Sequence, residues 1–463
     1  MAVAIIVAIF SLSYFCYALP TPDSQYFRGL TEYFIKTKNL DPSQVNHAYF
    51  QWPSFFLLAD IATSVSGLKL IDFEFLLYAI IGSLLAVTLY VYASRLYRNG
   101  AFLAVTAFFI SMFYFLNYQS APFSLALALV FVLFMLETQK KSAPVIVTML
   151  VLFFSISVTH FFVPLFFVIY LLVRSLISRS KQYAAFSLLT LFIYLLCQFT
   201  LGLYWFAFNI RQIFRWPSEY ISVAQATLKQ VSMPIDVMAQ TVSRAVTIAI
   251  VLMCFVGFVF LLVRRRSRAI DKAIFLAGVA YSALGFVLYS LGSRAIPILF
   301  IPVSLGAACL LETRFRSYLK GLFLVLLILF VFVPLHTSYN SYTYGSFVPI
   351  QTKEAFNAEH FLMDHYDWTK PSLILAHSPV TVYLLSSLDI NQINAAFESD
   401  FSSTFPRLSQ YDCILYTIGL GNSFLSYNYT LEGIVYDEKL DVIYNNGFSD
   451  IAIKGSSFAQ APK

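Results

Sequence analysis

The acidic residue best placed for chemistry is Asp23, four residues after the first apolar run. It stands in PTPDSQYFRGLTEYF, which predicts a loop that leads into an amphipathic helix with Asp23 near the helix N-terminus. The helix dipole stabilises a carboxylate there, whether the residue caps the helix or takes part in a reaction. In a reaction, Asp23 would be a metal ligand or a base that takes the proton of an acceptor hydroxyl attacking an electrophilic carbon.

A second candidate is His160, at the junction of two apolar segments in SVTHFFVP. An imidazole in apolar surroundings needs a polar partner, so we interpret His160 either as a packing residue with its own partner or as a catalytic group. We expect Asn117 and Gln119, from a neighbouring outer turn, to lie beside it.

Arginine supplies the third type of candidate. Arg294, in GSRAIPILFIP, either extends to the membrane surface or binds a phosphate group. A guanidinium can bind two phosphate oxygens at once and offset the negative charge that grows on a phosphate leaving group. Arg211, Arg215 and Arg244 are weaker candidates for the same role.

The elements that must position these residues are apolar helices. The chain is 59% hydrophobic and 12% charged, whereas a soluble domain has roughly 25% charged residues. Its apolar runs suit helices that cross a hydrocarbon core of about 30 Å. We count about 11 spans, at residues 2–19, 73–93, 101–117, 121–136, 143–160, 161–173, 183–208, 245–263, 270–290, 295–311 and 319–335. The sequence therefore predicts a polytopic α-helical membrane protein.

Basic residues follow every second apolar run, at 95–98, 140–141, 174–181, 264–268 and 314–320. By the positive-inside rule these run ends are cytoplasmic, as is the N-terminus, whose first apolar run we interpret as a retained span. The segment 53–67 is short and contains Asp60, so we interpret it as an interfacial helix. Asp23, His160 and Arg294 then share the outer face, where we expect a common cavity.

The predicted membrane domain covers residues 1–335, with a first outer loop at 20–72 and a second large outer loop at 209–242. Residues 336–463 predict a small extracytoplasmic α/β domain. Its expected elements are helices at 354–365 and 380–388, strands at 372–376 and 413–417, and a hairpin turning at Asn446 and Gly447. Asn428, in NYT, is a candidate N-glycan acceptor.

Several segments together resemble the GT-C superfamily of membrane glycosyltransferases, and its uncharacterised archaeal members in particular. They are the region around Asp23, YFQWPSFFLLADIATSVSGL, NYQSAPFSLALAL, SVTHFFVPLFF, GSRAIPILFIP and DVIYNNGFSDIAIK. The resemblance implies transfer of a sugar from a polyprenyl-phosphate donor, outside the membrane, to a protein, glycan or lipid acceptor. It implies Asp23 as base or metal ligand, with Mg²⁺ or Mn²⁺ as the metal, and Arg294 as the residue that holds the lipid phosphate.

Within that resemblance we expect Glu32, His47, Trp52, Asn117 and Gln119 to line the acceptor or sugar pocket. The chain departs from the superfamily in having one acidic residue where many members have two adjacent ones, and it lacks the WWDYG motif of oligosaccharyltransferases. Two alternatives stay open: a transporter or flippase of lipid-linked saccharides, and a non-catalytic envelope protein. We expect no nucleic-acid partner, because the basic residues stand in short clusters between apolar runs.

Overall fold

The computed structural model of the 463-residue chain describes twelve segments and isolated positions between 252 and 325. The segments are 22–38, 48–97, 100–116, 121–139, 142–203, 268–287, 353–368, 372–375, 395–398, 412–417, 441–445 and 449–453. The chain divides into two compact units. The first comprises Met1–Ala8, Leu40–Leu58 and Leu76–Val333, and the second Ile9–Asn39, Ala59–Phe75 and Pro334–Lys463.

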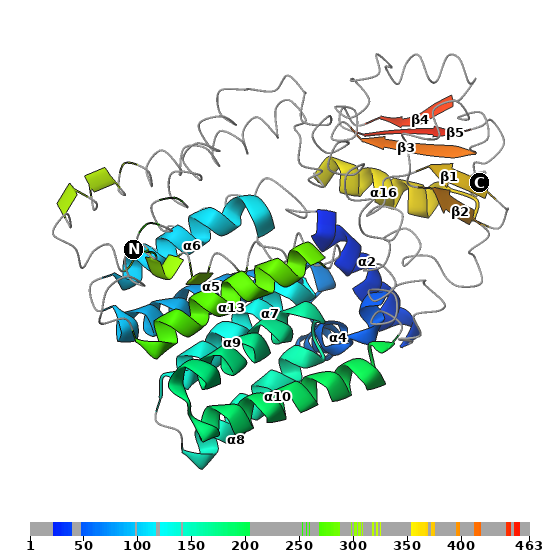
Figure 1. Cartoon of the computed structure of the whole chain (residues 1–463). Helices are drawn as coiled ribbons and strands as arrows, with labels where there is room; N and C mark the ends of the chain where they lie inside the picture. Colours follow the sequence, from blue (N-terminus) through cyan, green and yellow to red (C-terminus); the bar gives the residue numbers. More distant parts are fainter. Residues whose placement is uncertain are drawn as a thin grey trace. The chain divides into compact units, whose positions relative to one another are not determined.

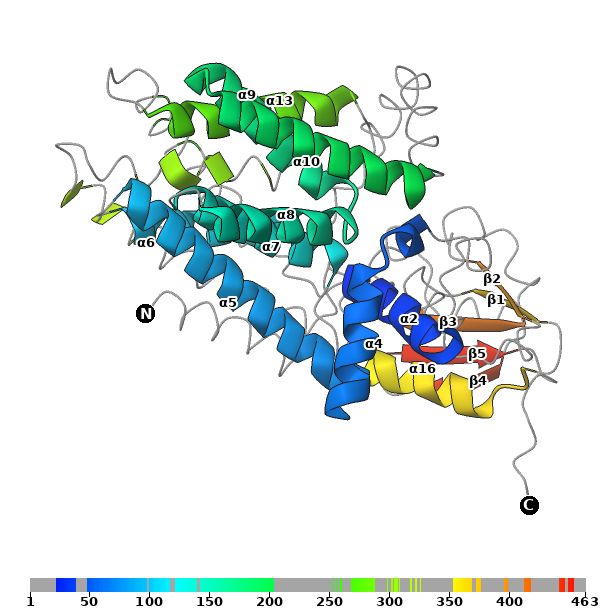
Figure 2. The ribbon, with the colours of Figure 1, turned by 90° about the horizontal axis from the view of Figure 1, so that it is seen from below.

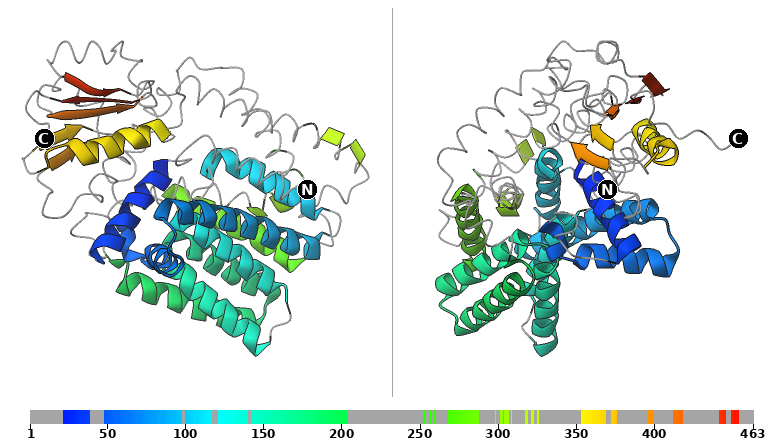
Figure 3. Two further views of the ribbon diagram at one scale, coloured as in Figure 1. Left: turned by 180° about the vertical axis from the view of Figure 1, so that it is seen from behind. Right: turned by 90° about the vertical axis from the view of Figure 1, so that its right-hand side faces the viewer.

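The first unit is a helical bundle. Its helices are α6 (Ala101–Leu116), α7 (Pro122–Glu137), α8 (Ala143–Ser157), α9 (Phe162–Ser178), α10 (Lys181–Thr200), α13 (Ala269–Val287) and most of α5 (Leu70–Leu96). A short 3₁₀ helix, η1 (Ala48–Gln51), precedes α4 (Ser54–Ser66). Helix α9 packs against α7, α8, α10 and α13 (Figure 1), and Figure 3 shows the bundle from two further sides.

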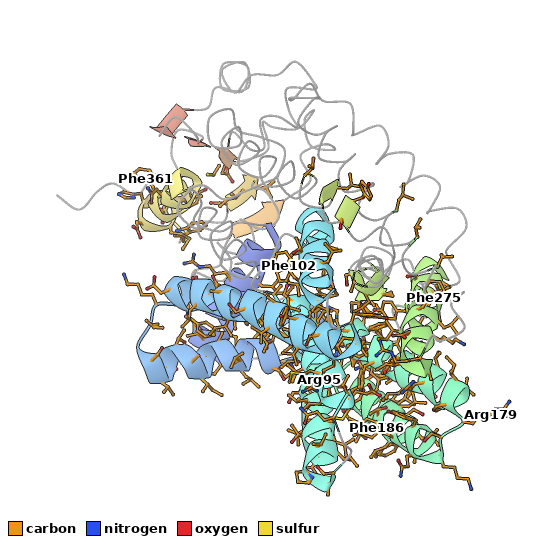
Figure 4. The ribbon with its side chains drawn as sticks, turned by 90° about the vertical axis from the view of Figure 1, so that its left-hand side faces the viewer. Arg95, Phe102, Arg179, Phe186, Phe275 and Phe361 are labelled. Carbon is orange, nitrogen blue, oxygen red and sulfur yellow. The ribbon has the colours of Figure 1, made fainter. Side chains whose placement is uncertain are left out.

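Local sequence explains where several of these helices begin and end. Pro122 and Pro144 stand in the first turn of α7 and α8, where the helix does not use the backbone N–H that proline lacks. Helix α9 ends at Arg179, whose left-handed backbone (φ 49°) turns the chain into α10. The side chain of Arg179 extends away from the helices (Figure 4).

Two described helices are long and apolar enough to cross a membrane, at Asp72–Leu96 and Lys181–Thr200. The predicted spans at 121–136, 143–160 and 161–173 correspond to the shorter apolar helices α7, α8 and α9. Large apolar side chains are exposed along α8 and α10, as suits faces in contact with hydrocarbon: Ile146, Val147, Val151, Phe154, Leu188, Leu189, Phe192, Leu196 and Phe199. The predicted span at 2–19 lies outside the described residues.

The predicted interfacial helix at 53–67 is α4, which has 13 residues. At 1.5 Å per residue it is about 20 Å long, which is too short to cross a core of about 30 Å. One side is buried through Phe55, Phe56 and Ala59, while Ile61 and Val65 are exposed. Such a helix suits the membrane interface.

The second unit contains α2 (Pro22–Thr37), α16 (Lys353–His365) and a five-stranded sheet. The strands are β1 (Ser372–Leu375), β2 (Ala395–Glu398), β3 (Cys413–Thr417), β4 (Asp441–Asn445) and β5 (Ser449–Ile453). Their order is β2-β1-β3-β5-β4, and α16 packs on β5 (Figure 2). Strands β2, β1 and β3 run parallel, whereas β5 is antiparallel to β3 and β4.

These elements agree with most of the sequence-based expectations for the C-terminal region. Helix α16 and strands β1 and β3 lie within a residue of the predicted bounds, and β4 and β5 pair as the predicted hairpin. Strand β2 was not predicted. The expected helix at 380–388, Asn428 and the turn at Asn446 and Gly447 lie outside the described residues.

Candidate functional site

His160 lies in the turn between α8 and α9 and is 2% exposed. Its Nδ1 accepts hydrogen bonds from the backbone N–H groups of Phe162 (3.1 Å) and Val163 (3.4 Å). These are among the N–H groups that a helix leaves without an internal partner, so the imidazole caps the N-terminus of α9. Because Nδ1 accepts, the proton of the neutral ring is on Nε2. His160 can therefore donate a hydrogen bond through Nε2, while its Nδ1 is engaged by the backbone.

The α8–α9 turn is a meeting point for distant parts of the first unit. Trp52 packs edge-on against Phe161, with ring centroids 5.6 Å apart. The backbone N–H of Ser54 donates to the carbonyl oxygen of Val158 (3.3 Å). From α13, the Tyr281 hydroxyl donates to the carbonyl oxygen of Phe162 (3.1 Å). The predicted first outer loop and α13 are thus attached to the turn that holds His160.

A residue that the sequence did not single out completes this region. Gln198, in the last turn of α10, is 1% exposed, and its Oε1 accepts a hydrogen bond from Trp52 Nε1 (3.2 Å). The only sequence signal for it is a polar amide inside the apolar run LLCQFTLGLYW. That signal indicates a polar residue in an apolar helix, but it does not identify Trp52, 146 residues away, as its partner.

Charged residues gather at the other end of the bundle. Glu137 accepts a hydrogen bond from the Tyr183 hydroxyl (2.6 Å) and lies 3.9 Å from Arg174 Nε. Arg95 Nη1, at the end of α5, donates to Thr138 Oγ1 (2.6 Å). Three of the helix ends that the sequence marks with basic residues therefore meet here.

The start of α13 joins the same end of the bundle. Asp271 accepts a hydrogen bond from the Tyr97 hydroxyl (2.8 Å), and Arg268 Nη2 donates to the carbonyl oxygen of Leu96 (2.7 Å). The described part of the bundle thus has a basic end and, opposite it, an end formed by Trp52, His160 and Gln198.

In the second unit, α2 begins at Pro22, so Asp23 stands in its first turn as predicted. The side chain of Asp23 lies outside the described residues. Farther along the same helix, Arg28 is buried. Its Nε forms an ion pair with Glu32 Oε1 (3.0 Å). Glu74, at the start of α5, is also buried and interacts electrostatically with both. Helix α2 thus carries ionisable groups on a largely buried element.

The structure places two predicted site residues, Trp52 and His160, around the α8–α9 turn of the first unit. It places Asp23 and Glu32 on α2 of the second unit. The remaining predicted site residues lie outside the described part of the chain: His47, Asn117, Gln119, Arg211, Arg215, Arg244 and Arg294.

Metal binding was predicted at Asp23, with Mg²⁺ or Mn²⁺ as the ion. In the described residues, no three His, Cys, Asp or Glu side chains gather into a metal site. Glu32, the other predicted carboxylate on α2, is engaged by Arg28. Metal binding at Asp23 stays a prediction.

No protein-family model matches the chain, and no curated protein matches it in sequence. Among solved structures, it is similar to ArnT from Cupriavidus metallidurans bound to undecaprenyl phosphate, with a TM-score of 0.54 and 10% identity, over 99% of this chain and 98% of that chain. ArnT in the apo state matches with a TM-score of 0.53 and 10% identity, over 97% and 96% of the two chains. At this identity the likeness is one of fold, and it extends over both units. The chain therefore has the fold of ArnT.

Proposed function

We propose that this protein is a glycosyltransferase that moves a sugar from a polyprenyl-phosphate donor to a protein, glycan or lipid acceptor on the outer face of the membrane. The observation that carries this proposal is the end-to-end similarity of fold to ArnT, which was solved with undecaprenyl phosphate bound. A lipid phosphate bound to a protein of this fold supports a lipid-linked donor here.

In the proposed reaction, the hydroxyl oxygen of the acceptor attacks the anomeric carbon of the donor sugar and forms a new C–O bond. Asp23 takes the hydroxyl proton as attack proceeds. The bond between the anomeric carbon and the phosphate oxygen breaks, and the polyprenyl phosphate leaves with the electron pair. Arg294, helped by Arg211, Arg215 and Arg244, offsets the charge that develops on the phosphate. Attack opposite the leaving group inverts the anomeric configuration.

The two ends of the helical bundle support the proposed sidedness. Arg95, Arg174 and Arg268 mark one end, which by the positive-inside rule faces the cytoplasm. The end with Trp52, His160 and Gln198 then faces outward, the side on which we propose that transfer takes place.

The test is transfer by purified full-length protein in proteoliposomes, with radiolabelled undecaprenyl-phosphate and dolichyl-phosphate hexoses as donors. Assays with added Mg²⁺ or Mn²⁺, and with EDTA, examine the predicted metal dependence. We expect Asp23→Asn and Arg294→Ala to lower transfer at least about 100-fold, since each removes a group that acts in the transition state. The matched control is Asp60→Asn, because Asp60 is a carboxylate of the same predicted loop that is paired with Lys38.

Full transfer by both folded variants would overturn the site assignment while leaving the class intact. Wild-type protein that moves a lipid-linked saccharide across the bilayer without cleaving it would overturn the enzyme proposal in favour of the transporter.

A further inference from the structure

The buried amide of Gln198 is oriented by its neighbour. An indole N–H can only donate a hydrogen bond, so the atom of Gln198 that faces Trp52 Nε1 must be the carbonyl oxygen Oε1. The amide NH₂ group then points to the other side of the side chain. The nitrogen and the oxygen of a glutamine amide are hard to tell apart in a structure. Here the indole donor decides that the oxygen faces Trp52.

The backbone at Gly202 keeps the amide in place. A Cβ at Gly202 would lie 2.8 Å from Gln198 Oε1 and 3.1 Å from Trp52 Cζ2, so the glycine backbone closes directly over the pair. The Gly202 N–H also donates to the backbone carbonyl of Gln198 (2.9 Å). Trp52 and Gly202 together hold the carbonyl side of the amide.

The amide nitrogen is different. Within the part of the chain that the structure describes, Gln198 Nε2 is buried and has no hydrogen-bond partner. Buried polar groups in folded proteins are nearly always hydrogen-bonded, so this donor calls for an acceptor that the described residues do not supply. Gln198 stands in the last turn of α10, at the same end of the bundle as His160 and Trp52, where the proposed reaction takes place.

We infer that Gln198 is a substrate-binding residue whose amide N–H donates to an oxygen of the polyprenyl-phosphate sugar donor. The inference rests on the proposed function and deepens it. The hydrogen-bond acceptor is an oxygen of the donor's phosphate or of one of its sugar hydroxyls. A neutral amide N–H can donate to either. Trp52 positions the amide, and the role of Gly202 is to leave room for it.

The experiment uses three substitutions that separate donor binding from structural support, and a fourth as a control. Gln198→Glu keeps an oxygen acceptor for Trp52 and removes the NH₂ donor. Gln198→Met removes both the acceptor and the donor. It therefore also tests the case in which the buried glutamate of the first variant becomes protonated and can again donate a hydrogen bond. Trp52→Phe removes the indole donor and leaves the amide intact. Gln182→Glu is the matched control, since Gln182 is an exposed glutamine at the opposite end of the same helix.

Binding of undecaprenyl phosphate and of an undecaprenyl-phosphate hexose is measured on full-length protein in nanodiscs, together with Tm and with the KM and kcat of transfer. We expect both Gln198 variants to weaken binding of the hexose-bearing lipid about tenfold, as for the loss of one hydrogen bond. The KM for the donor should rise by the same factor, with kcat within about twofold of wild type. An equal loss for the lipid without sugar identifies a phosphate contact, and a loss confined to the hexose-bearing lipid identifies a sugar hydroxyl.

The inference is overturned if Gln198→Glu binds the lipids and transfers the sugar like wild type. The result is most decisive if Gln198→Met and Trp52→Phe also lose binding and transfer to the same extent. That pattern would mean that Gln198 only holds Trp52, with a bound water as the partner of its NH₂ group. If wild-type protein binds the donor but transfers nothing, the proposed function fails separately. If wild-type protein binds neither lipid, both fail.

Discussion

At the scale of single residues, hydrogen bonds decide which atoms remain available for chemistry. His160 uses Nδ1 to cap α9, so this atom is engaged by the backbone. Gln198 uses Oε1 for Trp52, which leaves the NH₂ group. For Gln198 the group that remains is a hydrogen-bond donor. This suits recognition of the oxygens of a phosphate or a sugar better than it suits proton abstraction, the role proposed for Asp23.

A residue-scale prediction concerns Cys413, which lies on β3 and is fully buried. Burial raises the pKa of its thiol, and the adjacent Asp412 raises it further. Because the folded pKa is above the unfolded value of about 8.5, the thiol contributes stability that is complete below that pH and is lost as the pH rises above it. A variant that keeps only this cysteine should react with maleimide at pH 8 many times more slowly when folded than in denaturant.

Equal labelling rates in the folded and denatured states would contradict the buried position. Replacing Cys413 with Ala in the same background provides the control, since it should abolish the labelling in denaturant.

At the scale of elements, short connections and close contacts hold the helices in register. The turn from α5 to α6 passes Gly100, where a Cβ would lie 2.6 Å from Ala308 Cα and closer still to the Ala308 carbonyl oxygen. Contacts of this kind are shorter than any real Cβ makes, so only glycine allows this approach. At the same end of the bundle, Glu137 joins α7, α9 and α10 through Tyr183 and Arg174.

The corresponding prediction is that Gly100→Ala lowers the free energy of unfolding by about 1–3 kcal/mol, through the cost of overpacking against backbone. Thermal unfolding in detergent measures the effect as a fall in Tm. Gly82→Ala is the comparison, because nothing lies within 4 Å of a Cβ at that helical position. There the substitution should be neutral or raise stability by about 0.5–1 kcal/mol. Similar Tm values for the two variants would mean that Gly100 does not make this close approach.

At the scale of the whole molecule, the similarity to ArnT spans nearly the full length of both chains although 10% of residues are identical. A fold can persist at such identity because an apolar helix tolerates exchange among leucine, isoleucine, valine and phenylalanine while its volume and pattern are kept. The sidedness of the chain is a separate property, set by where the basic residues stand.

The predicted topology places Ser66 outside the membrane and Arg179 in the cytoplasm. In a variant without native cysteines, Ser66→Cys on the predicted outer segment should react with a membrane-impermeant maleimide on intact cells. Arg179→Cys, in the exposed turn between α9 and α10, should react only after the membrane is permeabilised. The reverse pattern would invert the topology and move the proposed reaction to the cytoplasmic face.

Hydropathy and local patterns were sufficient for most of the described helices and strands. The apolar runs predicted α5 to α10, the short run with Asp60 predicted α4, and the alternation CILYT predicted β3 with its observed bounds. These predictions succeed because the tendency to form a helix or strand depends on neighbours within one or two turns. The resemblance to the GT-C superfamily likewise rests on segments of the sequence, whereas the likeness to ArnT is one of fold.

The tertiary structure alone decided what the polar residues do. No local pattern shows that Trp52 donates to Gln198, 146 residues away. The segment Ala395–Glu398 is as short as β1, and it forms strand β2 because it pairs in parallel with β1. Hydrogen bonds between distant segments depend on how helices and strands pack, and packing arises from the whole chain. The sequence therefore determined the class and most of the described elements, and the structure determined that Gln198 is held by Trp52 through its carbonyl oxygen.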